Sequence, residues 1–197
     1  MAHLNTRGYI TIVSGVPRSG TSFMMRMLEA GGIPALTDNI RKPDAHNPHG
    51  YYEYEPVKRL ATDSSWMESA RGKAVKIIYP LLCHLPPGFK YRVIFMDRDL
   101  AEVFDSQREM LIARGDPTAA QHETRIIRTL AHEVHAIKEW LAARPSTTML
   151  TVPYAELVSD PSKWSAQVAR FLSGSLNEDA MALIADPVLY RHQRRAK

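Results

Sequence analysis

The chain has 197 residues, of which 45% are hydrophobic and 23% are charged, a balance typical of one globular domain with a sizeable core. No apolar run approaches the ~18 residues of a membrane helix, and residues 1–7 lack the apolar stretch of a secretory signal. Its single cysteine, Cys83, excludes an internal disulfide and any multi-cysteine metal site, so we expect a reducing, cytoplasmic location.

The formal net charge is +4, and part of it comes from the basic tail at residues 191–197. Such a charge suits an anionic ligand but does not single out nucleic acid, so we expect neither a nucleic-acid nor a membrane partner. The tail is interpreted either as a solvated end or as an arm that closes on phosphate. We expect one domain over residues 1–197, and the sequence leaves a homo-oligomer open.

Short β-branched runs alternate with amphipathic segments along the chain. Residues 9–14 predict a buried strand, and residues 21–30 predict a helix that ends at Gly31-Gly32. After a loop at 37–50, the pattern predicts helices at 56–69, 99–114 and 120–143 and from Asp160-Pro161 to about 173, with strands at 74–79, 91–96 and 147–152. The alternation predicts an α/β fold of three layers, with helices on both faces of a central parallel sheet.

The loop after the first expected strand has the spacing of a phosphate-binding turn. Gly15 and Gly20 lie five residues apart, as in a Walker A loop, but Thr21 stands where a nucleotide triphosphatase has its lysine. The positive charge lies inside the loop instead, at Arg18. This difference argues against ATP or GTP hydrolysis, whereas backbone N–H groups at a helix N-terminus still favour phosphate binding.

A second candidate anion site follows the strand at residues 91–96. Arg98 at the carboxyl end of that strand offers a planar fork of donors, and Ser106 lies eight residues later on the following helix. Because ligands of parallel sheets bind at the carboxyl edge, we expect the chemistry after residues 14, 79 and 96.

Together these motifs resemble those of the sulfotransferase family, which implies a fold similar to P-loop nucleotide triphosphatases. The first matches the family's 5′-phosphosulfate loop, Pro-(Lys/Arg)-Ser-Gly-Thr-(Thr/Ser), through Pro17, Arg18, Ser19, Gly20, Thr21 and Ser22. Its arginine form is similar to that of protein-tyrosine sulfotransferases and of many bacterial members. The spacing of Arg98 and Ser106 is that of the family's 3′-phosphate site.

The resemblance implies a donor and roles for these residues. The donor is 3′-phosphoadenosine 5′-phosphosulfate (PAPS), which leaves as adenosine 3′,5′-bisphosphate, and no metal is required. Arg18 is expected near the bridging oxygen that departs, and Thr21 and Ser22 with loop N–H groups hold the 5′-phosphate. The acceptor is a small molecule with a hydroxyl, phenol or amine.

The acceptor needs a base, and several residues compete for that role. Small-molecule enzymes of the family carry a lysine and a histidine two residues apart; Lys76 matches the lysine, and Ile78 replaces the histidine. Residues 47–53 resemble a bacterial sulfotransferase segment, Asn-Pro-x-Gly-(Tyr/Phe)-(Tyr/Phe)-Glu. Protein-tyrosine sulfotransferases use a glutamate that follows the first helix, and this resemblance implies that Glu53 is the base and that Lys76 contacts the sulfuryl oxygens. The reserves for the base are Glu55, His46 and His49.

Two rival functions stay open. A P-loop kinase or nucleotidase would need a magnesium-binding carboxylate at a strand end, and Asp97 is the attractive candidate. A non-catalytic protein that binds PAPS or its product would fit the missing strand histidine. The pair His132 and His135 is three apart, unlike zinc-binding His-Glu-x-x-His, and is expected on a solvated helix face.

Overall fold

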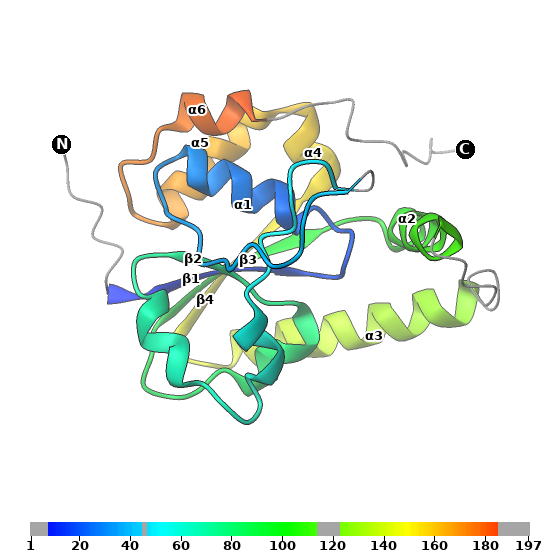
Figure 1. Ribbon diagram of the computed structural model, residues 1–197, viewed down its shortest axis with the longest axis horizontal. Helices are drawn as coiled ribbons and strands as arrows, with labels where there is room; N and C mark the ends of the chain where they lie inside the picture. Colours follow the sequence, from blue (N-terminus) through cyan, green and yellow to red (C-terminus); the bar gives the residue numbers. More distant parts are fainter. Residues whose placement is uncertain (1–7, 45–46, 114–122, 185–197) are drawn as a thin grey trace.

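The computed structural model describes residues 8–44, 47–113 and 123–184, so the basic tail lies outside the described residues. Four parallel strands form one sheet in the order β2-β1-β3-β4 (Figure 1). Their bounds are Ile10–Gly15 for β1, Ala74–Lys76 for β2, Tyr91–Asp97 for β3 and Thr147–Pro153 for β4. β1 lies between β2 and β3, with Val13 paired to Lys76 and Gly15 paired to Met96.

Both faces of the sheet are buried, because successive strand side chains point to opposite sides. In β1, Ile12 packs into one core cluster and Val13 into the other; in β3, Phe95 and Ile94 divide in the same way. The almost continuous apolar runs in these strands therefore serve two cores. The predicted α/β class, with a central parallel sheet covered on both faces, is confirmed.

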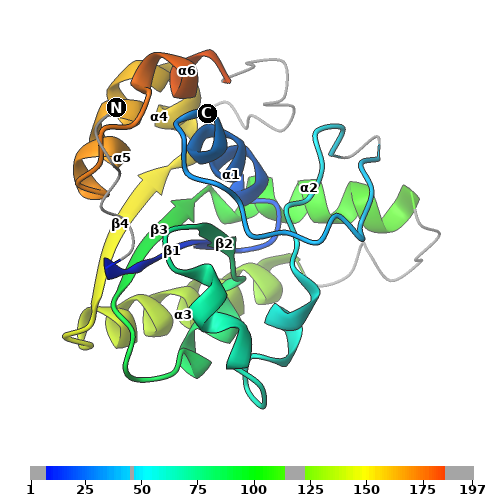
Figure 2. The same cartoon turned by 60° about the vertical axis from the view of Figure 1, so that its left-hand side comes forward.

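One face is covered by α1 (Thr21–Ala30), α4 (Tyr154–Ser159), α5 (Pro161–Phe171) and α6 (Glu178–Leu183), as the two views in Figures 1 and 2 show. Across the sheet lies α3 (Glu123–Ala142), which buries Val134, Ile137 and Leu141 at helical spacing. Short 3₁₀ helices extend this layer: η2 (Glu55–Arg59), η3 (Ser65–Ala70) and η4 (Tyr79–His84). His132 and His135 are exposed on α3, as expected.

The remaining helix, α2 (Leu100–Ala113), directly follows β3 and lies beyond the carboxyl edge of the sheet (Figure 2). It brings Ser106 toward the loop that follows β1. No helix in the described part of the chain has both the length and the apolar character needed to cross a membrane.

The structure differs from the predicted boundaries of two elements, the helix at 56–69 and the strand at 74–79. The expected helix at 56–69 is divided into η2 and η3, because Asp63 accepts hydrogen bonds from the backbone N–H and hydroxyl of Ser65 and so competes with helical bonding. The expected strand at 74–79 stops at Lys76. The last sheet hydrogen bond runs from the Ile77 N–H to the Val13 carbonyl oxygen, and the chain turns into η4 at Tyr79.

Candidate active site

The loop between β1 and α1 is shaped by close backbone approaches. A Cβ on Gly15 would lie 2.7 Å from the Met96 carbonyl oxygen, and one on Gly20 would lie 2.5 Å from the Tyr154 ring. Gly20 also has a φ of 98°, which favours glycine, and Arg18 has a φ of 78° although it carries a side chain. These glycines allow the loop to lie tightly between β3 and α4.

The loop leaves the N-terminus of α1 open to an anion. No side chain caps this end, and the first turn of α1 contains no acidic residue, so its backbone N–H groups and positive dipole end remain for a ligand. The side chain of Thr21 lines the adjacent cavity. Ser19 is buried, and its hydroxyl has no hydrogen-bond partner among the described residues.

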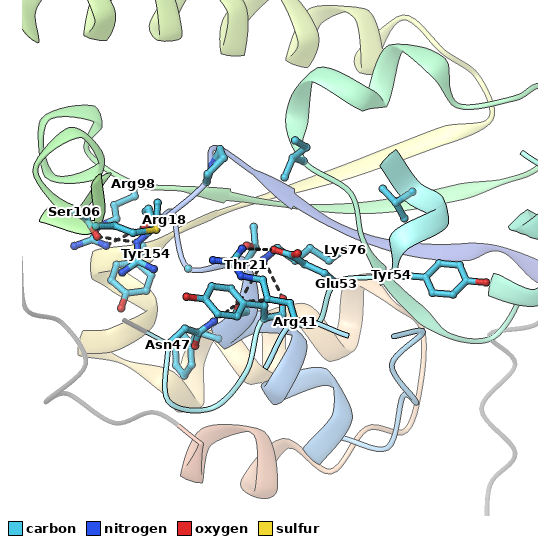
Figure 3. Close-up of a pocket in the computed structure, with 18 of the residues that line it drawn as sticks. Arg18, Thr21, Arg41, Asn47, Glu53, Tyr54, Lys76, Arg98, Ser106 and Tyr154 are labelled. Atoms are coloured by element: carbon cyan, nitrogen blue, oxygen red, sulfur yellow. Dashed lines mark hydrogen bonds and ion pairs between the residues drawn. The ribbon is translucent and has the colours of Figure 1, made fainter. Parts of the chain in front are cut away.

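Arg18, Arg98 and Ser106 come together although they are far apart in sequence. The Nε of Arg18 donates to the hydroxyl of Ser106 at 3.0 Å, and Nη1 of Arg98 donates to the Arg18 carbonyl oxygen at 3.1 Å. Glu102 on α2 accepts from Arg98 Nε at 3.1 Å, and the Arg98 guanidinium lies 4.7 Å from the centre of the Tyr154 ring. The two candidate anion sites therefore share one end of a cavity (Figure 3).

This end of the cavity concentrates positive charge on two partly buried arginines, Arg18 and Arg98. Burial lowers the pKa of Arg18 from its ordinary value, and the neighbouring positive charge of Arg98 lowers it further. The negative charge of an anion bound here would raise the pKa of Arg18 again and so offset both effects. The arrangement is thus suited to a ligand with several negative groups.

Lys76 and Glu53 lie on the other side of Thr21 from Arg98 (Figure 3). The Nζ of Lys76 donates to the Tyr51 carbonyl oxygen at 3.1 Å, and Nη1 of Arg41 contacts Oε1 of Glu53 at 2.7 Å. The Arg41 guanidinium also stacks 3.3 Å from the centre of the Tyr51 ring. Burial lowers the pKa of Lys76 to about 8, and the charge of Glu53 offsets part of this effect.

The lowered pKa of Lys76 predicts a pH-dependent stability. Between about pH 8 and pH 10.5 the unfolded chain binds a proton at this lysine that the folded protein has lost, so the free energy of unfolding should rise with pH. Lys76→Met should lack that rise. Melting temperatures of both proteins across this range measure the difference, and parallel pH profiles would contradict the prediction.

These groups line a cavity of about 470 Å³ at the carboxyl edge of the sheet. The predicted site residues that line it are Pro17, Arg18, Gly20, Thr21, Ser22, Glu53, Lys76, Arg98 and Ser106, whereas Ser19 is buried and does not line it. Glu55 pairs with Lys58 and, like His49, does not line the cavity; His46 lies outside the described residues. Ile78 does line it.

Among the cavity residues that were not predicted from the sequence, Arg41 and Tyr154 have the clearest interactions with predicted site residues. Arg41 lies in a stretch that was expected only to be a loop, and nothing local marks it as a partner of Glu53. Tyr154 follows the carboxyl end of β4, which was not among the strand ends where the chemistry was expected. The second omission was avoidable, because every strand of a parallel sheet ends at the ligand-binding edge.

Comparisons with known proteins agree with this geometry. Residues 10–196 match the family model described as the sulfotransferase domain. The sulfotransferase domain of the olefin synthase from Synechococcus PCC 7002 has a similar fold, with a TM-score of 0.55 and 19% identity over 98% of this chain and 86% of that one.

A sulfotransferase from Alicyclobacillus acidocaldarius is similar at a TM-score of 0.52 and 18% identity, over 85% of this chain and 81% of that one. No curated protein matches the sequence significantly. These two structural likenesses establish the fold, and the match to the family model covers the strands, the loop and the cavity described above. The chain therefore belongs to the sulfotransferase domain family.

Proposed function

We propose that this sulfotransferase transfers the sulfuryl group from PAPS to a hydroxyl, phenol or amine of a small acceptor. The observation that carries the proposal is the junction of the two anion sites. Arg18 in the first bonds to Ser106 in the second, and Arg98 in the second bonds to the Arg18 carbonyl oxygen. A ligand with two separated phosphate groups, such as an adenosine bisphosphate, fits two adjoining anion sites of this kind.

The donor would lie along the loop with its sulfuryl group toward Lys76. Backbone N–H groups at the start of α1 and the hydroxyl of Thr21 would bind the 5′-phosphate, and Arg98 and Ser106 would bind the 3′-phosphate. Tyr154 and Phe23 contact each other edge to face at 6.3 Å and both line the cavity, so they offer an aromatic surface for adenine.

The reaction is an in-line displacement at sulfur. The acceptor oxygen or nitrogen forms a bond to sulfur, the bond from sulfur to the bridging phosphate oxygen breaks, and adenosine 3′,5′-bisphosphate departs with the electron pair. Arg18 would stabilise the charge that builds on the departing oxygen, and Lys76 that on the sulfuryl oxygens. Glu53 would take the acceptor's proton.

The rival P-loop kinase has less support from the geometry. Its candidate magnesium ligand, Asp97, pairs with Lys138 at 2.9 Å and does not line the cavity. In the described residues, no group of three histidine, cysteine, aspartate or glutamate side chains is placed to hold a metal. Metal-free transfer itself stays a prediction, checked by activity in the presence of a chelator.

Calorimetry with three nucleotides tests the proposal without knowledge of the acceptor. Adenosine 3′,5′-bisphosphate should bind at least about tenfold more tightly than adenosine 5′-monophosphate, because charged hydrogen bonds to the 3′-phosphate contribute about 1.5–3 kcal/mol each. ATP should bind no better than the monophosphate. Equal affinity for the monophosphate and bisphosphate, or a magnesium-dependent preference for ATP, would contradict the proposal.

A further inference from the structure

The hydroxyl of Ser22 contacts the acceptor side of the cavity. It donates to the Tyr51 carbonyl oxygen at 3.3 Å. It accepts from Nδ2 of Asn47 at 3.1 Å and from Nζ of Lys76 at 3.3 Å. Three partners from two separate parts of the chain thus converge on one hydroxyl at the start of α1.

These contacts use the full hydrogen-bonding capacity of a serine hydroxyl, which has one donor hydrogen and two acceptor lone pairs. To donate to a phosphate, Ser22 would have to release the Tyr51 carbonyl oxygen. The neighbouring hydroxyl differs, because no hydrogen bond joins the Thr21 side chain to another described residue, and Thr21 also lines the cavity. The two adjacent hydroxyls therefore have different environments.

We propose that Ser22 is a positioning residue, whose hydroxyl, together with Asn47, ties the donor loop to the segment that carries Glu53. The proposal rests on the function proposed above and assigns the phosphate-binding hydroxyl to Thr21 alone. The backbone N–H of Ser22 remains at the open end of α1 for the 5′-phosphate.

The tie to Glu53 runs through a short, tightly bonded segment at residues 47–53. The Asn47 side-chain amide, while bound to Ser22, also donates to the Gly50 carbonyl oxygen at 2.6 Å, and Gly50 has a φ of 88° that favours glycine. Three residues after Gly50, the Glu53 carbonyl oxygen accepts from the Thr37 hydroxyl at 2.8 Å. A displacement of Ser22 is thus transmitted to the backbone just before Glu53.

Occupancy of the donor loop should therefore be felt in this segment. A phosphate bound to the first turn of α1 fixes that turn and, through Ser22, fixes Asn47 and the Tyr51 carbonyl oxygen. Local opening of residues 49–53 then becomes less frequent when the nucleotide is bound. In this way the segment that carries the base would be held more firmly while the donor is present.

The matched variants Ser22→Ala and Thr21→Ala test the proposal with adenosine 3′,5′-bisphosphate as the probe. By calorimetry, Thr21→Ala should weaken binding about tenfold, and Ser22→Ala should change the dissociation constant by less than about threefold. By hydrogen exchange, the nucleotide should slow residues 49–53 in the unaltered protein and in saturated Thr21→Ala, but not in Ser22→Ala.

Asn47→Asp tests the same connection at the residue that donates to Ser22. It keeps the side-chain shape and removes the two amide donor hydrogens. It should also lose the nucleotide-dependent slowing and keep its affinity, and Ser22→Ala combined with it should have no additional effect. If Ser22→Ala weakens binding as much as Thr21→Ala, or keeps the slowing, the tie is refuted while the proposed function stands. If the unaltered protein fails to bind the bisphosphate, the proposed function itself is refuted.

Discussion

Arg18→Ala is expected to lower the rate of sulfuryl transfer by at least about 100-fold, because the guanidinium would no longer stabilise charge on the departing phosphate oxygen. Arg18 joins the loop to Ser106 and is the charged side chain of the loop between β1 and α1. Single-turnover transfer from PAPS to nitrophenol, followed by the loss of nitrophenolate absorbance, measures the effect.

Arg18→Lys, measured in the same assay, distinguishes the effect of the positive charge at this position from the effect of the planar guanidinium. The lysine keeps a positive charge but has no planar fork, so we expect it to recover only part of the lost rate. Arg125→Ala, at an exposed arginine of α3, is the control and should transfer at the normal rate. Normal transfer by Arg18→Ala would show that the charge on the leaving group is stabilised elsewhere.

Glu53→Gln is expected to lower turnover by about 100-fold or more and to leave the affinity for adenosine 3′,5′-bisphosphate nearly unchanged. The amide cannot accept the acceptor's proton, but it keeps the size of the carboxylate and can still contact Arg41, which lies 2.7 Å from Glu53 in the present structure. Turnover is measured with unsubstituted phenol, which keeps its proton at neutral pH and so needs the base, by following the release of adenosine 3′,5′-bisphosphate; nucleotide affinity is measured separately by calorimetry.

The chain supplies a matched control two residues away. Glu55 is paired with Lys58 outside the cavity, so Glu55→Gln should turn over normally. If Glu55→Gln is inactive and Glu53→Gln is active, the base has been assigned to the wrong glutamate. If both are active, neither carboxylate accepts the proton.

The donor side of the site could be anticipated from sequence because its requirements are local. A tight turn before a helix needs glycine at fixed positions, and Gly15 and Gly20 stand where a Cβ would collide with neighbouring groups. An arginine that ends a buried strand must emerge at the sheet edge, and Arg98 does so. Both features appear as short motifs in the sequence, although the groups that a Cβ would meet, Met96 and Tyr154, come from distant parts of the chain.

The acceptor side could not be anticipated to the same degree because it depends on contacts between distant segments. Arg41 meets Glu53 and Tyr51 only because the loop that carries it folds back across them. The use of the Ser22 hydroxyl depends equally on where Tyr51 and Lys76 come to lie. Helical periodicity at 56–69 was misleading, since Asp63 interrupts the helix by a short-range bond that the apolar pattern does not reveal.

The two sides of the cavity are supplied by different segments of the chain, which has an evolutionary consequence. Arg41, Glu53 and Tyr54 all come from one continuous stretch between α1 and β2, whereas the groups assigned to the donor come from the ends of β1 and β3 and from α2. Exchange of that stretch with a relative, by recombination or by design, would change which acceptors fit and leave nucleotide recognition in place. Under the proposed function, most of the acceptor side is therefore encoded by one continuous segment, and Lys76 on β2 lies outside it.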